Sequence, residues 1–206
     1  MKKKLLLLLM LLGLVVFAAA CGDISTEKAS TYTDDIQAVE VDVPEGKPQP
    51  VEEEGHEIDK SESGTCTLTV ECSTILHNME KLDTAKTALV PEDGIIYATR
   101  EVTFYDGETV FDVLKRELQK EKIHMEFSTN PIYNSSYVEG IGNIYEFDCG
   151  NLSGWNYAVN GWFPNYGCGR YRVSEGDVIE WHYTCDLGKD IGNDYMEEKT
   201  EATETE

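Results

Sequence analysis

The stretch from residue 154 to residue 184 constrains the fold more than any other part of this chain. It reads GWNYAVNGWFPNYGCGRYRVSEGDVIEWHYT and holds all three tryptophans. Asn160 and Gly161 form the residue pair preferred in a type I′ turn, where both central residues need a positive φ. The pattern predicts a β-hairpin around this pair. It also predicts a closing strand over residues 178–185, in which apolar and polar residues alternate.

The predicted hairpin gathers aromatic rings on one surface. A two-residue turn sets Val159 opposite Trp162, and Pro164, which has no N–H, limits how far the second strand can continue. Such a surface can fill a core or bind a flat ligand. In the structural alternative Trp155 and Tyr157 are core residues and Asn160 only turns the chain. The candidate ligand-binding residues are Trp155, Tyr157, Asn160, Trp162, Phe163 and Tyr166.

The first residues have the pattern of an export signal. Three lysines precede an apolar run over residues 5–17, and three alanines then lead to Cys21. A short charged region, a short apolar region and small residues predict a secretory signal peptide over residues 1–20. The alanines and Cys21 resemble the lipobox of bacterial lipoproteins, which implies lipidation of Cys21. An ordinary secretory signal is the alternative. We expect a lipid-anchored protein on the extracytoplasmic face of a bacterial membrane, attached by lipid alone.

Two acidic segments flank the rest of the chain. Residues 21–64 are rich in aspartate and glutamate and lack a sustained apolar period, which predicts a disordered tether after the lipidated cysteine. Residues 188–206 predict a disordered acidic tail in the same way. The formal net charge of the whole chain is −22 at pH 7. Such a charge argues against a nucleic-acid partner.

Between these segments, residues 65–187 form one domain's worth of chain. Strands are predicted over residues 66–72, 95–104 and 145–149, with residues 73–94 forming an excursion between the first two. Thr109 is expected to begin a helix, with Asp112 at the reciprocal capping position. The buried stripe of this helix is predicted at Phe111, Leu114 and Leu118. The order of elements predicts an α+β fold in which one helix packs across a mixed sheet.

Five cysteines remain after Cys21, and outside the cytoplasm disulfides are expected. Sequence alone leaves fifteen arrangements with two bridges and one spare thiol. If the first and last strands lie side by side in parallel, Cys72 and Cys185 share one end of the sheet. We therefore predict Cys72–Cys185 and Cys149–Cys168, with Cys66 spare. No Cys-x-x-Cys motif is present and the histidines are scattered, so no metal site is expected.

Several motifs together resemble those of a known family. They are Gly154-Trp-Asn-Tyr-Ala-Val-Asn-Gly161, Phe163-Pro-Asn165, Gly176-Asp-Val-Ile-Glu-Trp181 and the strand-to-helix entry at residues 105–114. Residues 65–187 thereby resemble the transcobalamin-like C-terminal domain. The resemblance implies a β-grasp-like fold and, as ligand, cobalamin or another corrinoid. The vertebrate carriers of that family complete their site with an α-barrel domain that this chain lacks.

The leading hypothesis is a non-catalytic, lipid-anchored domain that binds a small molecule, with no cofactor of its own. The second is a protein-interaction or adhesion module whose partner is an envelope or transporter protein. An enzyme is the weakest of the three, because Cys168 and His182 are the one thiol–imidazole pair worth weighing. His77 and His124 are expected to be plain surface residues.

Overall fold

The computed structural model describes residues 41–130 and 135–193. The chain divides into two units, Met1–Ile36 and Gln37–Glu206, and every described residue lies in the second. The predicted signal peptide over residues 1–20, the lipidation site at Cys21, the first half of the predicted tether and residues 194–206 of the predicted tail lie outside the described residues.

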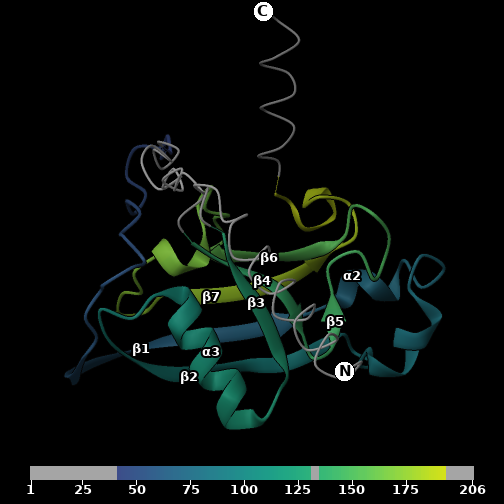
Figure 1. Cartoon of the computed structure of the whole chain (residues 1–206), viewed down its shortest axis with the longest axis horizontal. Helices are drawn as coiled ribbons and strands as arrows, with labels where there is room; N and C mark the ends of the chain where they lie inside the picture. Colours follow the sequence, from purple (N-terminus) through teal and green to yellow (C-terminus); the bar gives the residue numbers. More distant parts are fainter. Residues whose placement is uncertain (1–40, 131–134, 194–206) are drawn as a thin grey trace, which may run out of the picture. The chain divides into compact units, whose positions relative to one another are not determined.

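A four-stranded mixed sheet forms the base of the fold (Figure 1). Its order is β2 (Ile95–Asp106), β1 (Asp59–Glu71), β7 (Val178–Thr184) and β6 (Gly154–Val159). β1 and β7 pair in parallel, with Leu68 beside Ile179, and the other neighbours are antiparallel. The side-by-side arrangement of the first and last strands agrees with the condition on which the predicted cysteine pairing depended. β6 lies at one edge of this sheet.

Strict alternation in the central strands builds the core. Cys66, Leu68 and Val70 of β1 are buried, and so are Ile179 and Trp181 beside them on β7. Successive residues of a strand point to opposite faces, so these five side chains lie on one face of the sheet. The sequence predicted this buried face correctly for both strands.

The helix α3 (Val110–Glu121) covers this face, as Figure 1 shows. Thr109 caps it: its side chain accepts a hydrogen bond from the Asp112 N–H, and Asp112 accepts one from the Thr109 N–H in return. This is the predicted capping box. The predicted stripe of Phe111, Leu114 and Leu118 is buried, together with Val110, Val113 and Glu117. The α+β fold with one packed helix is confirmed.

A second, three-stranded antiparallel sheet packs on the same side. It consists of β3 (Met125–Asn130), β4 (Ser135–Ile141) and β5 (Ile144–Tyr145). Aromatic side chains join the two sheets through hydrogen bonds. The Trp155 indole N–H donates to the Ile144 carbonyl at 2.9 Å, and the Tyr183 hydroxyl donates to the Tyr145 carbonyl at 2.7 Å. Large rings with a polar end suit this role, because they fill the interior and still satisfy their polar atoms.

Short helical turns make the remaining connections. The excursion between β1 and β2 holds α2 (Ser73–Leu76) and η1 (Thr84–Leu89). η2 (Cys168–Arg170) precedes β7, and η3 (Lys189–Ile191) follows it. Within residues 41–130 and 135–193, no helix is long and apolar enough to cross a membrane.

The ordered domain begins well before the predicted boundary at Thr65. β1 starts at Asp59, which pairs with Asp106, and residues 41–58 contact the domain through hydrogen bonds. A disordered tether reaching residue 64 is therefore wrong for its second half. The acidic composition misled because these residues gain their partners from distant parts of the chain, which a local apolar count does not register.

The predicted hairpin is shorter than its sequence suggested. Asn160 and Gly161 both have positive φ (54° and 71°), and Val159 pairs with Trp162 as predicted. No ladder continues beyond Trp162. Pro164 accounts for this end, because it lacks the N–H that the next rungs would need.

The α3 cap can be tested through stability. We expect Thr109→Ala to lower the free energy of unfolding by about 1 kcal/mol, because the buried hydroxyl that receives the Asp112 N–H is lost. Urea denaturation followed by circular dichroism measures this. Thr87→Ala, at an exposed threonine in η1, is the matched control and should change stability by less than about 0.5 kcal/mol. Equal effects of the two substitutions would contradict the capping role.

Candidate ligand-binding site

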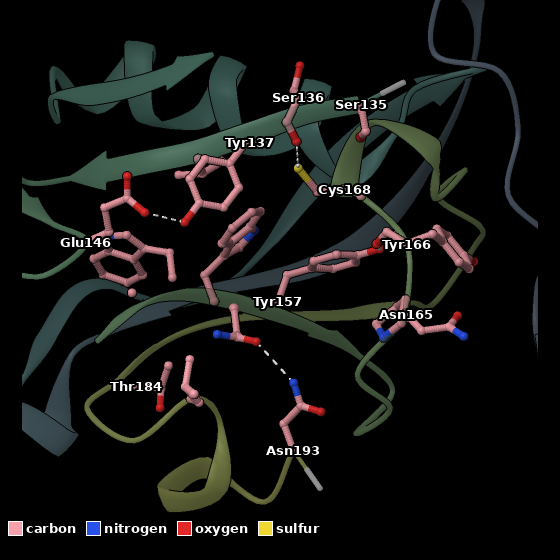
Figure 2. Close-up of a pocket in the computed structure, with 18 of the residues that line it drawn as sticks. Ser135, Ser136, Tyr137, Glu146, Tyr157, Asn165, Tyr166, Cys168, Thr184 and Asn193 are labelled. Carbon is pink, nitrogen blue, oxygen red and sulfur yellow. Dashed lines mark hydrogen bonds between the residues drawn. The ribbon is translucent and has the colours of Figure 1, made fainter. Parts of the chain in front are cut away.

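A pocket of about 950 Å³ lies where the edge strand β6 meets β4 and the segment that leads into η2 (Figure 2). The loop between β5 and β6 and the segment after β7 complete its lining. Val41 and Asp42, from the first described residues, also reach it. Six parts of the chain therefore line one pocket of the size that small-molecule sites usually have.

Aromatic side chains form one wall of the pocket. Tyr157, at the centre of Figure 2, lies 5.6 Å from Trp181 between ring centroids, and its hydroxyl donates to the Tyr166 carbonyl at 2.8 Å. Trp155 is held through its bond to Ile144. Burial raises the pKa of the Tyr157 phenol well above its ordinary value, so the hydroxyl stays protonated. Each ring of this wall is held by packing and by a hydrogen bond or a ring contact.

Three buried polar atoms in this pocket's lining have no hydrogen-bond partner. They are Ser135 Oγ, Asn165 Oδ1 and Trp181 Nε1, and within the described ranges no other buried side-chain nitrogen or oxygen is left in this state. Ser135 and Trp181 are each only 2% exposed. A buried polar group without a partner costs about 1–3 kcal/mol. Their gathering in one pocket points to a ligand or water that supplies the missing partners.

The free edge of β6 adds main-chain groups to the site. Asn160 N–H bonds to the Val178 carbonyl, whereas Val159 N–H turns away from β7 and bonds to the Trp162 carbonyl, both at 2.9 Å. Hydrogen bonding alternates along an antiparallel pair, so the N–H and C=O of Trp155 and Tyr157 also point away from β7. Residues 154–157 all line the pocket, which therefore reaches around this strand edge.

Polar side chains occupy the far side of β6. Asn193 donates to Asn156 at 3.1 Å, below the strand in Figure 2, and Thr184 lies beside them. On the other side, the Tyr137 hydroxyl donates to the Glu146 carboxylate at the pocket mouth. The pocket thus combines an aromatic interior with an amide-rich and acidic rim.

Residues 41–58, which we call the N-terminal strap, close one side of the site. Asn165 donates to the Asp42 carbonyl and Tyr166 to the Pro48 carbonyl, each at 2.7 Å. Val51 and Arg170 exchange two hydrogen bonds, at 2.9 and 3.1 Å. The strap therefore pairs along the segment that carries the pocket residues Asn165 and Tyr166.

Two ionisable residues fasten the end of the strap. The Glu53 carboxylate accepts hydrogen bonds from the N–H and hydroxyl of Ser136 on β4. Gly169 permits this approach, because an added Cβ there would lie 2.1 Å from the Glu53 carboxyl group. His56 lies between the Glu53 carbonyl at 2.7 Å and the Asp112 carboxylate at 3.0 Å. Both partners only accept, so the protonated imidazole, which donates from both nitrogens, fits this position best.

Three of the six candidate residues meet in the pocket. Trp155, Tyr157 and Tyr166 all line it, and all three are buried. They are at once core residues and pocket residues, so the two interpretations offered by the sequence are not exclusive.

The other three candidates lie outside the pocket's lining. Asn160 fixes the turn: its side chain donates to Asp177 at 2.8 Å and accepts from the Val178 N–H at 2.9 Å. Trp162 packs against Tyr166 and lies under the Lys47 ammonium of the strap, 5.1 Å from the ring centroid. Phe163 lies beside His182, with ring centroids 6.0 Å apart.

Sequence reasoning missed Ser135, Asn165 and Asp42 and took Trp181 for core alone. Ser135 and Asp42 carried no motif, and their place in the site follows from contacts between segments far apart in the chain. Asn165 stood within the quoted Phe163-Pro-Asn165 motif, which was the one signal that could have identified it.

The thiols and imidazoles are arranged differently from the patterns weighed in the sequence. Cys168 is buried against the Ser136 carbonyl, while His182 bonds to the Glu71 carboxylate at 2.6 Å, so the structure does not join them as nucleophile and base. Burial raises the pKa of the Cys168 thiol. Among the described residues, no group of three or more His, Cys, Asp or Glu side chains could hold a metal ion.

No two of the described cysteines are bonded to each other, so the predicted pairing stays a prediction. Cys66, Cys72, Cys149, Cys168 and Cys185 are all buried thiols here. Cys149 lies in hydrogen-bonding contact with Cys185, so each is next to a partner other than the one predicted for it. The sequence did not reveal this proximity, because the loop before β6 decides where Cys149 lies.

Comparison with known proteins finds one family model that matches part of the chain. Residues 107–185 match the family model described as a domain of unknown function, DUF4430. This segment runs from the start of α3 to the end of β7 and includes most of the pocket. No curated protein matches the chain.

Two solved structures resemble the fold at low identity. One is haptocorrin in complex with Cbi, with a TM-score of 0.44 and 14% identity over 64% of this chain. The chain spans only 27% of the length of that protein. The other is a candidate metal-binding protein from Ruminococcus gnavus ATCC 29149, with a TM-score of 0.37 and 16% identity. It matches 59% of this chain and 96% of its own.

The His56 contact predicts how stability depends on pH. Burial lowers the pKa of His56, but hydrogen bonds to the Glu53 carbonyl and to Asp112 outweigh this and raise it above its ordinary value of 6.5. A raised pKa stabilises the folded state below the unfolded pKa, and this contribution is lost as pH rises through the folded pKa. We therefore expect His56→Gln to destabilise the protein more at pH 5.5 than at pH 8.5.

Thermal unfolding at the two pH values measures this difference. His77→Gln is the matched control, since His77 is exposed and its substitution should change stability by less than about 0.5 kcal/mol. A loss of stability for His56→Gln that does not vary with pH would contradict the protonated contact.

Proposed function

We propose that this chain is a non-catalytic ligand-binding protein that holds a small molecule in the pocket beside β6. The observation that carries this proposal is the concentration of all three partnerless buried polar atoms in the lining of that pocket. A domain that served only as a spacer would have no use for three such atoms gathered in one pocket, where a ligand can supply their partners.

The same atoms define the chemistry of the ligand. Trp181 Nε1 can only donate, Asn165 Oδ1 can only accept, and the Ser135 hydroxyl can do either. The aromatic wall favours an apolar body, flat enough to lie against Tyr157 and Trp155. Asp42 and Glu146 line the site, so a neutral or cationic ligand is favoured over an anionic one. The ligand is therefore a ring-bearing molecule with both donors and acceptors on its rim.

A corrinoid is the first ligand to test. The motifs at residues 154–161 and 176–181 resemble those of the transcobalamin-like domain, and a corrin ring with amide side chains has a flat body and a rim of donors and acceptors. A volume of about 950 Å³ is at the upper end of ordinary small-molecule sites, which suits a large ligand.

We further propose that the domain acts at the cell surface. The leader over residues 1–20 and the lipobox-like Cys21 support a lipid anchor on the extracytoplasmic face of the membrane. A captured vitamin would there be passed to a transporter protein of the envelope. Removal of the signal peptide and acylation of Cys21, detected by mass spectrometry of the membrane fraction, test this placement separately from ligand binding.

Tryptophan fluorescence tests the ligand. Trp155 and Trp181 line the pocket, so a corrinoid bound there should quench their emission. We expect saturable quenching of the purified chain by cobalamin or by a smaller corrinoid. No response at high micromolar concentrations of either would remove the corrinoid and leave other ring-bearing ligands to be screened by the same signal.

A substitution at Ser135 tests the site itself. Because its hydroxyl has no partner in the free protein, Ser135→Ala should leave the melting temperature unchanged or raise it slightly. With a ligand that bonds this hydroxyl, the same change should raise Kd by about 5-fold, the value of one hydrogen bond. Phe163→Ala, outside the pocket, is the control and should leave Kd unchanged. A raised Kd for Phe163→Ala together with an unchanged Kd for Ser135→Ala would indicate that the ligand binds at the hairpin tip and not in the pocket.

A second candidate function rests on the free edge of β6. The outward main-chain groups of Trp155 and Tyr157 could pair with an extended segment of a partner protein, which would make the domain an interaction or adhesion module. In that case a pull-down from a cell-surface extract would recover a protein that a pocket ligand displaces. A Trp162→Ala, Phe163→Ala double variant would recover as much, because these residues lie outside the pocket.

A further inference from the structure

Two of the five buried cysteines lie against each other in the folded domain. The thiols of Cys149 and Cys185 are in hydrogen-bonding contact. Cys149 belongs to the loop between β5 and β6, and Cys185 follows the last residue of β7. Both side chains are buried, Cys149 completely.

Both sulfurs contact the same short segment, residues 74–78, at α2. Cys149 Sγ lies 3.4 Å from the Asn78 carbonyl, and Cys185 Sγ lies 3.7 Å from the Thr74 hydroxyl. Asn78 in turn donates to the Thr74 carbonyl at 2.9 Å, which ties these two residues at α2 together. The segment at α2 therefore holds both thiols from one side.

The backbone brings the two cysteines together independently of their side chains. Gly154 pairs with Thr184, and the Leu187 N–H bonds to the Leu152 carbonyl at 2.8 Å. The Cys149 N–H bonds to the Ser153 hydroxyl at 3.1 Å, which folds the loop back toward this pairing. These hydrogen bonds hold the loop before β6, which carries Cys149, beside the segment after β7, which carries Cys185.

The other three cysteines have different neighbours. Cys168 contacts the Ser136 carbonyl at 3.5 Å. Cys66 lies within β1, and Cys72, which follows β1, donates its N–H to the Gly94 carbonyl at 2.7 Å. The geometry therefore singles out one pair from the five thiols.

We propose that Cys149 and Cys185 form a disulfide when the chain folds in the presence of a disulfide oxidant. The two thiols lose two protons and two electrons as the S–S bond forms, and the oxidant, a small-molecule or protein disulfide, is reduced to two thiols. This inference goes beyond the proposed function, since it holds whether or not the pocket takes a ligand. It replaces the pairs Cys72–Cys185 and Cys149–Cys168.

The bond would close the base of the pocket. Residues of the loop after Cys149, among them Leu152 and Ser153, line the pocket on one side, and Thr184 and Leu187 line it beside Cys185. Hydrogen bonds already join these segments, among them Leu187 N–H to the Leu152 carbonyl and the Tyr183 hydroxyl to Ser153 Oγ. A covalent link fixes the position of the loop relative to β7, and with it one side of the site.

Burial of the two thiols determines at which stage of folding the disulfide can form. Burial raises the pKa of both thiols, that of Cys185 to about 12, so little thiolate exists in the folded, reduced domain. Thiolate is the attacking species in thiol–disulfide exchange. The oxidation therefore belongs to folding, before the loop closes over the sulfurs, and the finished bond is sheltered from reductants.

Peptide mapping of the full chain tests the pairing. The chain is unfolded, reduced, refolded with a mixture of glutathione and glutathione disulfide, quenched in acid and alkylated with N-ethylmaleimide. Trypsin alone leaves Cys149 and Cys168 in one peptide, because no lysine or arginine lies between Lys122 and Arg170. Added chymotrypsin separates them by cutting after aromatic residues between the two cysteines. We expect linked peptides that contain Cys149 and Cys185 and lack two hydrogen atoms.

Three variants sharpen the result. Cys168→Ser should keep the link, whereas Cys149→Ser should leave Cys185 alkylated. Refolding from the reduced, unfolded state without the oxidant should lower the melting temperature of the wild-type chain by on the order of 10 °C and leave that of a Cys149→Ser, Cys185→Ser double variant unchanged. Alkylation of both Cys149 and Cys185 in the refolded wild type, or a link from either to another cysteine, would overturn the proposal.

Discussion

The parallel pairing of β1 with β7 is the constraint on which the rest of the structure depends. It joins the first and last strands of the domain and places both at the centre of the four-stranded sheet. Two parallel neighbours cannot be joined by a short turn, so the chain between β2 and β6 must leave the sheet before it returns to it. α3, the second sheet and the aromatic turn are all parts of this return path. The sheet then has room for β6 only at its edge.

The edge position of β6 creates the candidate site. A central β6 would have both rows of its main-chain groups paired, and Trp155 and Tyr157 would be core residues and nothing else. At the edge, one row of β6 main-chain N–H and C=O groups has no neighbouring strand among the described residues. The pocket lies between this strand edge, the second sheet and the segment that precedes η2. The same rings therefore serve the core with one side and the pocket with the other.

The N-terminal strap shows how the domain protects what the edge leaves exposed. An open strand edge and a cluster of rings are liabilities for aggregation. The strap covers part of the ring cluster: Lys47 lies over Trp162, and the Pro48 carbonyl receives the Tyr166 hydroxyl. It is held by hydrogen bonds, by this ring–cation contact, by His56, and by Val41 and Val43, which pack against the core. A segment held in this way can be rich in acidic residues and still be ordered.

The sequence by itself determined the elements whose signals are local. The alternation of β1 and β7, the capping box of Thr109 and Asp112, and the positive φ at Asn160 and Gly161 each follow from a few neighbouring residues, because strand pleat, helix ends and turns obey short-range geometry. The tertiary structure alone decided what those elements enclose. The order of the strap, the pocket place of Ser135 and Asp42, and the meeting of Cys149 with Cys185 depend on contacts between residues far apart in the chain. No pattern of neighbouring residues records such contacts, since they exist only once the sheet has formed.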